Sequence, residues 1–187
     1  IDDLIDAVYS SKKLPNNSVL LTFDDGYSDH YENIFPILVK EKISGCFFPI
    51  ANPIIHNTVS EVNKIHFILA AMKSFDGLKA EIFNILDILR SEGLEIEPNQ
   101  ILYNSLAEKG RYDGSVVIFF KRLLQHKLDK DLRSIILNKL FYKYVTDDEI
   151  GFSTSLYLNK EKISEMLKFG MSFGNHTMSH PWLNKIK

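Results

Sequence analysis

Hydrophobic residues along this chain follow two periods, one typical of strands and one typical of helices. SVLLTF (18–23) and GCFFPI (45–50) are short, continuously apolar runs, as expected for buried parallel strands. Residues 28–42 between them have helical spacing, and Pro36 inside this segment is expected to kink the helix or shift its start. An amphipathic helix is predicted over 1–14. A strand, a helix and a strand in this order form a βαβ unit, which implies a parallel sheet.

Helical periodicity dominates the middle of the chain. The segments that show it are 60–73, 78–93, 113–127 and 129–145. The α/β pattern resumes with a helix over 159–170 and a short strand over 171–175. We therefore predict an α/β domain made of residues 1–51 and 146–187. Residues 52–145 are predicted to form a large all-helical insertion within the same domain.

Composition and charge narrow the classes of partner. The 187 residues are 45% hydrophobic, and 22 basic against 24 acidic side chains leave a formal net charge of −2. This ordinary globular composition gives no reason to expect nucleic acid as a partner. No apolar run reaches the roughly 20 residues that span a bilayer, so no transmembrane segment is predicted. No signal peptide is visible, but the chain opens at Ile1 rather than at Met, so the sequence assigns no compartment.

Two adjacent carboxylates follow the first predicted strand. Asp24 and Asp25 stand before Gly26, which permits a sharp turn because it adopts positive φ without a steric cost. Neighbouring residues within a strand point to opposite faces, but this alternation no longer applies if the pleat ends at Phe23 or Asp24. Both carboxylates would then converge on one cavity at the carboxyl end of a parallel strand, where α/β folds place ligands. A solvated Asp-Asp-Gly turn is the alternative.

Two histidines follow the last predicted strand. His176 and His180 in GNHTMSHPW are four residues apart, which in a helical turn puts both imidazoles on one face. Pro181 disfavours helical geometry at His180, so this turn must be brief. Two histidine nitrogens and one carboxylate oxygen form a common facial set for a divalent metal ion. A surface histidine pair without a metal is the alternative.

The motifs TFDDG and HTMSH together resemble the first two signature motifs of the polysaccharide deacetylases, carbohydrate esterase family four with its nodulation-type deacetylase homology domain. The resemblance implies part of a distorted (β/α) barrel with parallel strands, of which this chain would be the N-terminal portion. It also implies the residues of the site: Asp24 as general base, Asp25, His176 and His180 as metal ligands, and Thr177 and Ser179 as braces of the loop.

A deacetylase of this kind is a metal-dependent hydrolase of non-peptide C–N bonds, which removes N-acetyl or related acyl groups from a sugar or polysaccharide. The helical insertion resembles that of deacetylase-like proteins of bacterial surface-polysaccharide biosynthesis. The resemblance implies one divalent ion, Zn²⁺ first and Co²⁺ or Ni²⁺ as alternatives, and an N-acetylated carbohydrate as partner. The family's later motifs carry an arginine, an aspartate and the histidine general acid, and they cannot be matched after His180. The chain alone is therefore expected to be weak or inactive.

The unmatched motifs leave alternatives open. The histidines that could replace the missing acid are His30, His56, His66 and His126, of which His66 is expected to be associated with the core. The open sheet edge is expected to be covered by the helical insertion, by an oligomeric partner or by a missing C-terminal part. A non-catalytic carbohydrate-binding or assembly module that keeps the metal site is the alternative function. A phosphotransferase of the haloacid-dehalogenase type is disfavoured, because it needs an aspartate at position 26, which is Gly.

Overall fold

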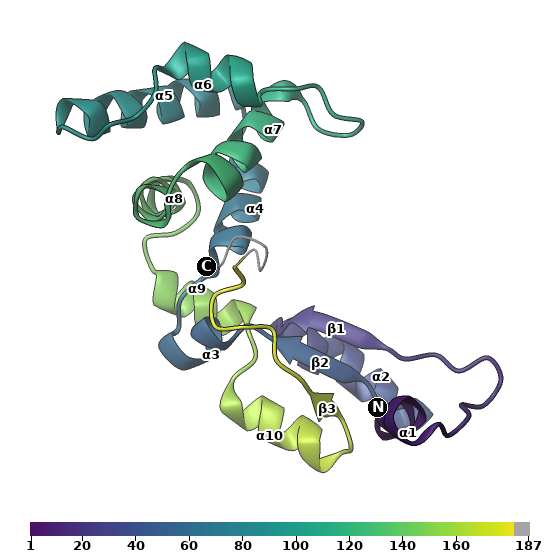
Figure 1. Cartoon of the computed structure of the whole chain (residues 1–187). Helices are drawn as coiled ribbons and strands as arrows, with labels where there is room; N and C mark the ends of the chain where they lie inside the picture. The colour runs from purple at the N-terminus through teal and green to yellow at the C-terminus, as the bar shows by residue number, and fades with distance from the viewer. Residues whose placement is uncertain (182–187) are drawn as a thin grey trace. The chain divides into compact units, whose positions relative to one another are not determined.

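A computed structural model of the chain describes residues 1–181 (Figure 1). The chain forms two compact units. The first combines Ile1–Ser60 with the segment that starts at Glu149, and the second is Glu61–Asp148. The short helix α3 (Ala51–His56), which lies in the predicted insertion except for its first residue, belongs to the first unit. The division into domains at residues 52 and 145 stays a prediction.

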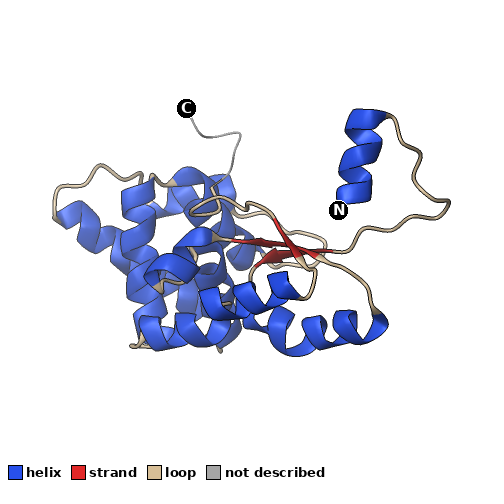
Figure 2. Cartoon of the chain, turned by 90° about the horizontal axis from the view of Figure 1, so that it is seen from below, coloured by secondary structure: helices blue, strands red, loops and turns tan. Residues whose placement is uncertain are grey.

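The first unit contains the three strands found among the described residues. Its elements in chain order are α1 (Asp2–Ser10), β1 (Thr22–Asp25), the π-helix η1 (His30–Ile34), α2 (Phe35–Glu41), β2 (Cys46–Pro49), α3, α9 (Glu149–Leu156), α10 (Lys160–Lys168) and β3 (Ser172–Phe173). The strands pair in parallel in the order β1-β2-β3 (Figure 2). The predicted α/β class with a parallel sheet is therefore confirmed.

A row of phenylalanines crosses this sheet. Phe23, Phe47 and Phe173 are register partners on the three neighbouring strands. The ring of Phe47 stacks on that of Phe23 at a centroid distance of 4.8 Å and on that of Phe173 at 5.5 Å. Phe47 is fully buried in one core cluster with residues of α2 and α10. Asp25 and His176 follow this row two and three residues later, so both reach the same edge of the sheet.

The first strand lies later than predicted. Pairing with β2 begins at Leu21, whose carbonyl accepts a backbone hydrogen bond of 2.9 Å, and β1 extends to Asp25 instead of ending near residue 23. Val19 is 82% exposed, so the start of the apolar run is not buried. The reason is that β1 is an edge strand whose one partner, β2, has four residues, and the partner decides which residues can pair. Asp24 and Asp25 are thus the last residues of the strand and do not follow it.

The predicted barrel is not seen. The described residues form an open sheet of three strands, whereas a closed (β/α) barrel needs about eight. Residues 61–148, nearly half of the chain, are helical and contribute no strand, and β1 and β3 therefore remain edges of the sheet. The fold is α/β and mostly helical.

The connection between β1 and β2 has two helical parts. Residues 30–34 form the π-helix η1, and α2 starts at Phe35. Pro36 is therefore the second residue of α2 and lies directly after the π-helix η1. This agrees with the predicted effect of Pro36 on the helix start. Short π segments occur often at functional sites, and this one begins five residues after Asp25.

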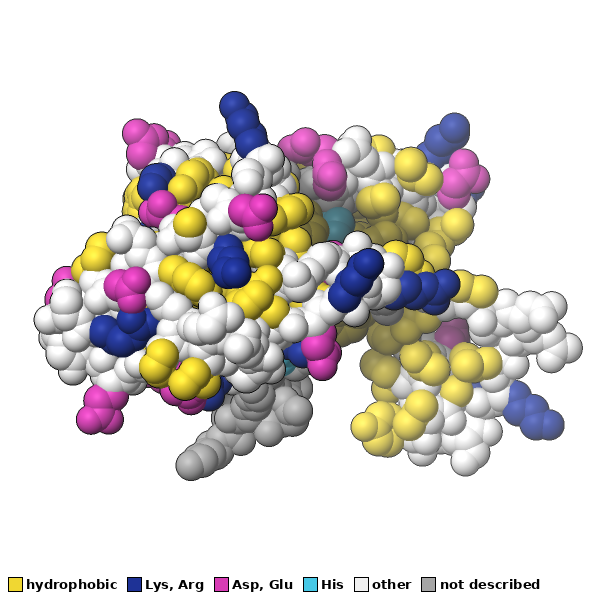
Figure 3. Space-filling view, turned by 90° about the horizontal axis from the view of Figure 1, so that it is seen from above, with side chains coloured by type: hydrophobic (Ala, Val, Ile, Leu, Met, Phe, Trp, Pro, Cys, Tyr) yellow, Lys and Arg dark blue, Asp and Glu magenta, His cyan; other side chains and the backbone are white. Residues whose placement is uncertain are grey.

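Helix α1 leaves much of its apolar surface open. Val8 and Tyr9 are 68% and 84% exposed. Figure 3 shows hydrophobic side chains on the molecular surface among charged ones. The helix ends at Ser10, earlier than the predicted residue 14, because Ser11 takes the left-handed conformation at φ +55°.

The second unit is built from helices alone in the residues described. They are α4 (Glu61–Ala71), α5 (Phe75–Ser91), α6 (Asn99–Leu106), α7 (Ser115–Arg122), the π-helix η2 (Leu123–Lys127) and α8 (Lys130–Tyr144). The four predicted helices are confirmed, and α6 is an addition. Their core includes fully buried side chains from several helices: Ile68, Leu86, Phe119, Leu124, Ile136 and Phe141. No described helix is long and apolar enough to cross a membrane.

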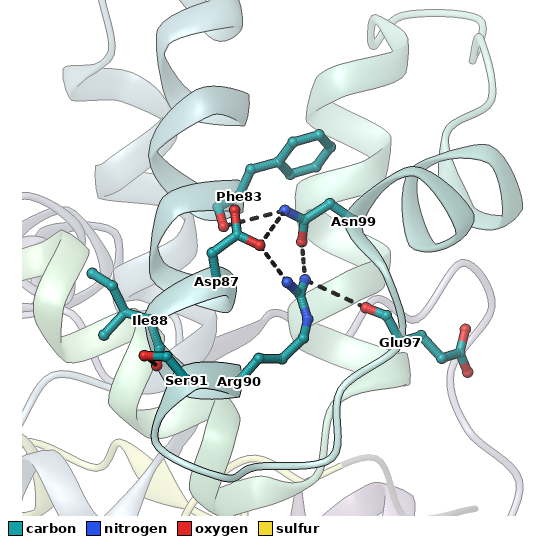
Figure 4. A network of polar contacts seen from close by, with 7 residues as sticks. All are labelled: Phe83, Asp87, Ile88, Arg90, Ser91, Glu97 and Asn99. Carbon is teal, nitrogen blue, oxygen red and sulfur yellow. Dashed lines mark hydrogen bonds and ion pairs between the residues drawn. The ribbon is translucent and has the colours of Figure 1, made fainter.

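A polar network fixes the turn between α5 and α6 (Figure 4). The guanidinium of Arg90 donates to the carboxylate of Asp87 and to the side-chain oxygen of Asn99. The amide of Asn99 donates in turn to Asp87 Oδ1 at 3.1 Å and to the carbonyl of Phe83 at 3.3 Å. These bonds join the end of α5 to the start of α6, so we assign the network a structural function in the second unit.

Candidate metal centre

Asp25 has an unusual backbone conformation at the carboxyl end of β1. Its φ is +70°, and the N–H of Gly26 donates to the carbonyl of Asp24 at 2.9 Å, which closes a γ-turn around Asp25. A left-handed conformation costs a residue with a Cβ about 1–2 kcal/mol. The turn lies at the last residue of β1, so the regular alternation of the strand does not apply to the side chain of Asp25.

His176 and His180 lie on a loop after β3 and not in a helical turn. Thr177 and His180 are both left-handed, at φ +65° and +54°, and this path brings the two imidazole centroids to 4.6 Å. Backbone amides at the start of α3 donate to the carbonyls of Thr177 and of the next residue, at 3.1 and 2.9 Å. The loop is therefore anchored to α3, and the spacing of four residues still gives a close histidine pair.

Asp25, His176 and His180 converge on one point at the carboxyl edge of the sheet. One carboxylate oxygen and one nitrogen from each imidazole lie within 4.8 Å of one another. Asp25 Oδ1 is 3.4 Å from His176 Nε2 and 3.8 Å from His180 Nε2. Ligands bound tetrahedrally to zinc at ~2.0–2.1 Å are ~3.3 Å apart. The donor types and their spacing therefore fit a small divalent ion with little movement.

The other predicted site residues, Asp24, Thr177 and Ser179, differ in whether their side chains form hydrogen bonds. Asp24 is exposed, and its carboxylate makes no hydrogen bond or ion pair with any described residue. Thr177 Oγ1 accepts a hydrogen bond of 3.0 Å from the backbone N–H of His180, within the same loop. The hydroxyl of Ser179 has no hydrogen-bond partner among the residues described. Asn175, which the motif analysis did not single out, accepts from the N–H of Thr177 at 2.6 Å.

Tyr27 is a further contact of the candidate ligand Asp25. Its hydroxyl donates to Asp25 Oδ2 at 3.0 Å, which leaves Oδ1 on the side of the histidines. The motif TFDDGY contains this tyrosine, but its contact depends on the turn at Gly26. The sequence does not predict this turn, because its central residue, Asp25, has a positive φ that is unusual for a residue other than glycine.

His30, one of the histidines proposed as a substitute for the missing acid, follows Asp25 by five residues in the sequence. Its ring packs among Phe23, Tyr27 and Phe47, each at a centroid distance of 5.8 Å. Burial lowers the pKa of His30, and the carboxylate of Asp25 opposes this shift. Nδ1 of His30 is buried and has no hydrogen-bond partner among the described residues.

The other histidines named as substitutes for the acid are exposed: His56, His66 and His126. The expectation that His66 is associated with the core is wrong. Helix α4 buries Ile65 and Ile68 instead, and the position between them on the helix faces outward.

Comparison with known protein families finds a match to the N-terminal part of the chain. The family model for polysaccharide deacetylase matches residues 11–68, a partial match that includes Asp24, Asp25 and Tyr27 but not the two histidines of the loop. No curated protein and no solved structure matches the chain. The resemblance carried by TFDDG is thus confirmed independently for this segment. Residues 11–68 of the chain are thus similar to the polysaccharide deacetylase family.

Proposed function

We propose that this chain provides the metal centre of a carbohydrate deacetylase, which hydrolyses an N-acetyl or related acyl group on a sugar or polysaccharide. The observation that carries the proposal is the convergence of Asp25, His176 and His180 at one edge of the sheet. Similarity to the family over residues 11–68 supports an acylated sugar as the class of substrate.

Asp25, His176 and His180 would hold the ion. Two imidazole nitrogens and one carboxylate oxygen suit Zn²⁺ first and Co²⁺ or Ni²⁺ as alternatives, and three protein ligands are typical of catalytic rather than structural zinc sites. A bound divalent ion would supply Lewis acidity, which polarises an acyl carbonyl toward attack by water.

Asp24 would act as the general base in this proposal. Its environment differs from that of its neighbour: Asp24 is exposed, whereas Asp25 faces two imidazoles and a tyrosine hydroxyl. The carboxylate oxygens of Asp25 therefore both have contacts, with Tyr27 and with the two histidines, while a carboxylate oxygen of Asp24 would be free to accept a proton from water. Thr177 and Asn175 would keep the histidine loop in place through their hydrogen bonds.

Calorimetric titration with Zn²⁺ tests the metal centre. We expect the wild-type chain to bind about one equivalent, and Asp25→Ala and His176→Ala to abolish this binding, because each removes one of three ligands. His66→Ala is the matched control, since it deletes an exposed imidazole in the second unit. Stoichiometric zinc binding by both ligand variants would contradict the proposal.

Deacetylation assays with added Zn²⁺ or Co²⁺ test catalysis, using chitooligosaccharides and a small aryl acetate as substrates. A general base contributes about 10²–10⁴-fold to rate, so Asp24→Asn should lower turnover by about that factor while zinc affinity is retained. Turnover unchanged by this substitution would remove Asp24 from the mechanism.

A carbohydrate-binding or assembly module that retains the metal site is the second candidate function. Asp24 is not part of the group of three ligands that lie within 4.8 Å of one another, and this favours the second candidate. This candidate predicts zinc and sugar binding without turnover on any of the acylated substrates. Turnover that is lost in Asp24→Asn would exclude it.

A further inference from the structure

We infer that Tyr27 is a positioning residue for the metal centre, which holds the carboxylate of Asp25 so that Oδ1 alone is presented to the ion. The inference rests on the proposed metal site and concerns a residue outside the ligand set. Tyr27 does not touch substrate or metal in this proposal. Its effect is exerted through Asp25.

The first argument is the division of the two carboxylate oxygens. Tyr27 Oη donates to Oδ2 of Asp25 at 3.0 Å, while Oδ1 lies 3.4 and 3.8 Å from the two histidine nitrogens. A hydrogen bond to an ionised carboxylate is stronger than one between neutral groups. The bond therefore fixes the rotation of the carboxylate and occupies the oxygen that faces away from the histidines.

The second argument is the backbone of Asp25. A residue with a Cβ at φ +70° in a γ-turn is strained, and such a conformation persists only where the surroundings hold it. The carbonyl of Gly26 accepts a bond from the N–H of Leu158 at 2.8 Å, directly after the turn. The hydroxyl of Tyr27 adds a bond to the side chain of Asp25 itself.

The third argument is that Tyr27 is itself held. It forms a backbone bridge with Tyr157, and the two rings stack at a centroid distance of 5.9 Å and an interplanar angle of 12°. Tyr157 is 2% exposed, so its ring is packed inside the first unit. His30 packs edge-on against the ring of Tyr27. The phenol is thus confined by neighbours and can act as a rigid support.

Cobalt titration of matched variants tests this inference. Tyr27→Phe removes the hydroxyl that contacts Asp25 and keeps the ring, whereas Tyr157→Phe removes the hydroxyl of the stacked ring and leaves the bond to Asp25. Loss of an outer hydrogen bond to a ligand typically costs 10–100-fold in metal affinity. We expect Tyr27→Phe to weaken Co²⁺ binding by about 10- to 100-fold and to change the Co²⁺ ligand-field absorption. Tyr157→Phe should change neither.

A comparison of folding with metal affinity separates positioning from general destabilisation. Circular dichroism of Tyr27→Phe should match that of the wild type. If the wild type binds Co²⁺ and Asp25→Ala does not, but Tyr27→Phe binds as the wild type does, the inference is overturned and the metal site stands. If the wild type does not bind Co²⁺, both are overturned.

Discussion

Gly26 is the position where a single methyl group should reveal how tightly the Asp25 turn is packed. Its φ is +75°, and a Cβ built there would lie 2.6 Å from Pro49 Cβ and 3.0 Å from Pro49 Cα on the neighbouring strand. The left-handed conformation costs alanine about 1–2 kcal/mol. Forcing an extra carbon into a packed site costs about 1–3 kcal/mol more. Gly26→Ala should therefore destabilise the first unit by about 2–5 kcal/mol.

Gly170→Ala is the matched control for this prediction. Gly170 lies in the same unit and has φ +83°, but a Cβ there would meet no atom within 4 Å. It should cost only the conformational part, about 1–2 kcal/mol. Urea unfolding followed by far-ultraviolet circular dichroism measures both values from the shift of the transition midpoint at constant slope.

The difference between the two variants isolates the contact with Pro49. Pro49→Gly removes the closest atom, so Gly26→Ala should cost less in that background than in the wild type. Equal destabilisation by Gly26→Ala and Gly170→Ala would refute the reasoning, because it would mean that the turn has room for a methyl group.

Three further outcomes follow from the structure. Phe47→Ala should lower the free energy of unfolding by about 3–5 kcal/mol, because it empties a fully buried site between two stacked rings. Phe169→Ala is the control, since the side chain of Phe169 is 57% exposed, and an equally small loss in both variants would contradict the prediction. Asp129→Ala should cost about 1 kcal/mol, because its carboxylate accepts the first free amides of α8; unchanged urea midpoints would contradict the cap. Burial lowers the pKa of His30 below 6.5, so between the two pKa values the unfolded chain binds a proton that the folded chain does not. The free energy of unfolding should therefore fall as pH drops below 6.5 and level off below the pKa of the folded state. NMR titration of the imidazole and urea midpoints of His30→Gln check this, since the variant should lose that part of the pH dependence.

Much of the secondary structure is predictable from the sequence because it depends on local periodicity. The four helices of the second unit and α10 follow the spacing of their apolar residues. The first strand is the informative exception. Its residues Val19 and Leu20 are more hydrophobic than Asp24 and Asp25, yet the aspartates pair with β2 and the aliphatic residues remain exposed. Which residues of the first strand can pair depends on where β2 begins and ends, and the hydrophobicity of residues 18–21 does not specify this.

The candidate site divides in the same way. The sequence by itself determined which side chains could bind a metal. Residue type and spacing select His176, His180 and the aspartate pair, and the resemblance to the deacetylases singles out Asp25 within that pair. Only the tertiary structure decided that Asp25 has a left-handed backbone, that the histidines lie on a loop held by α3, and that Tyr27 reaches the carboxylate. The physical reason is that a parallel sheet brings the carboxyl ends of distant strands to one edge, and that strained local conformations are stable only when contacts from elsewhere in the fold hold them.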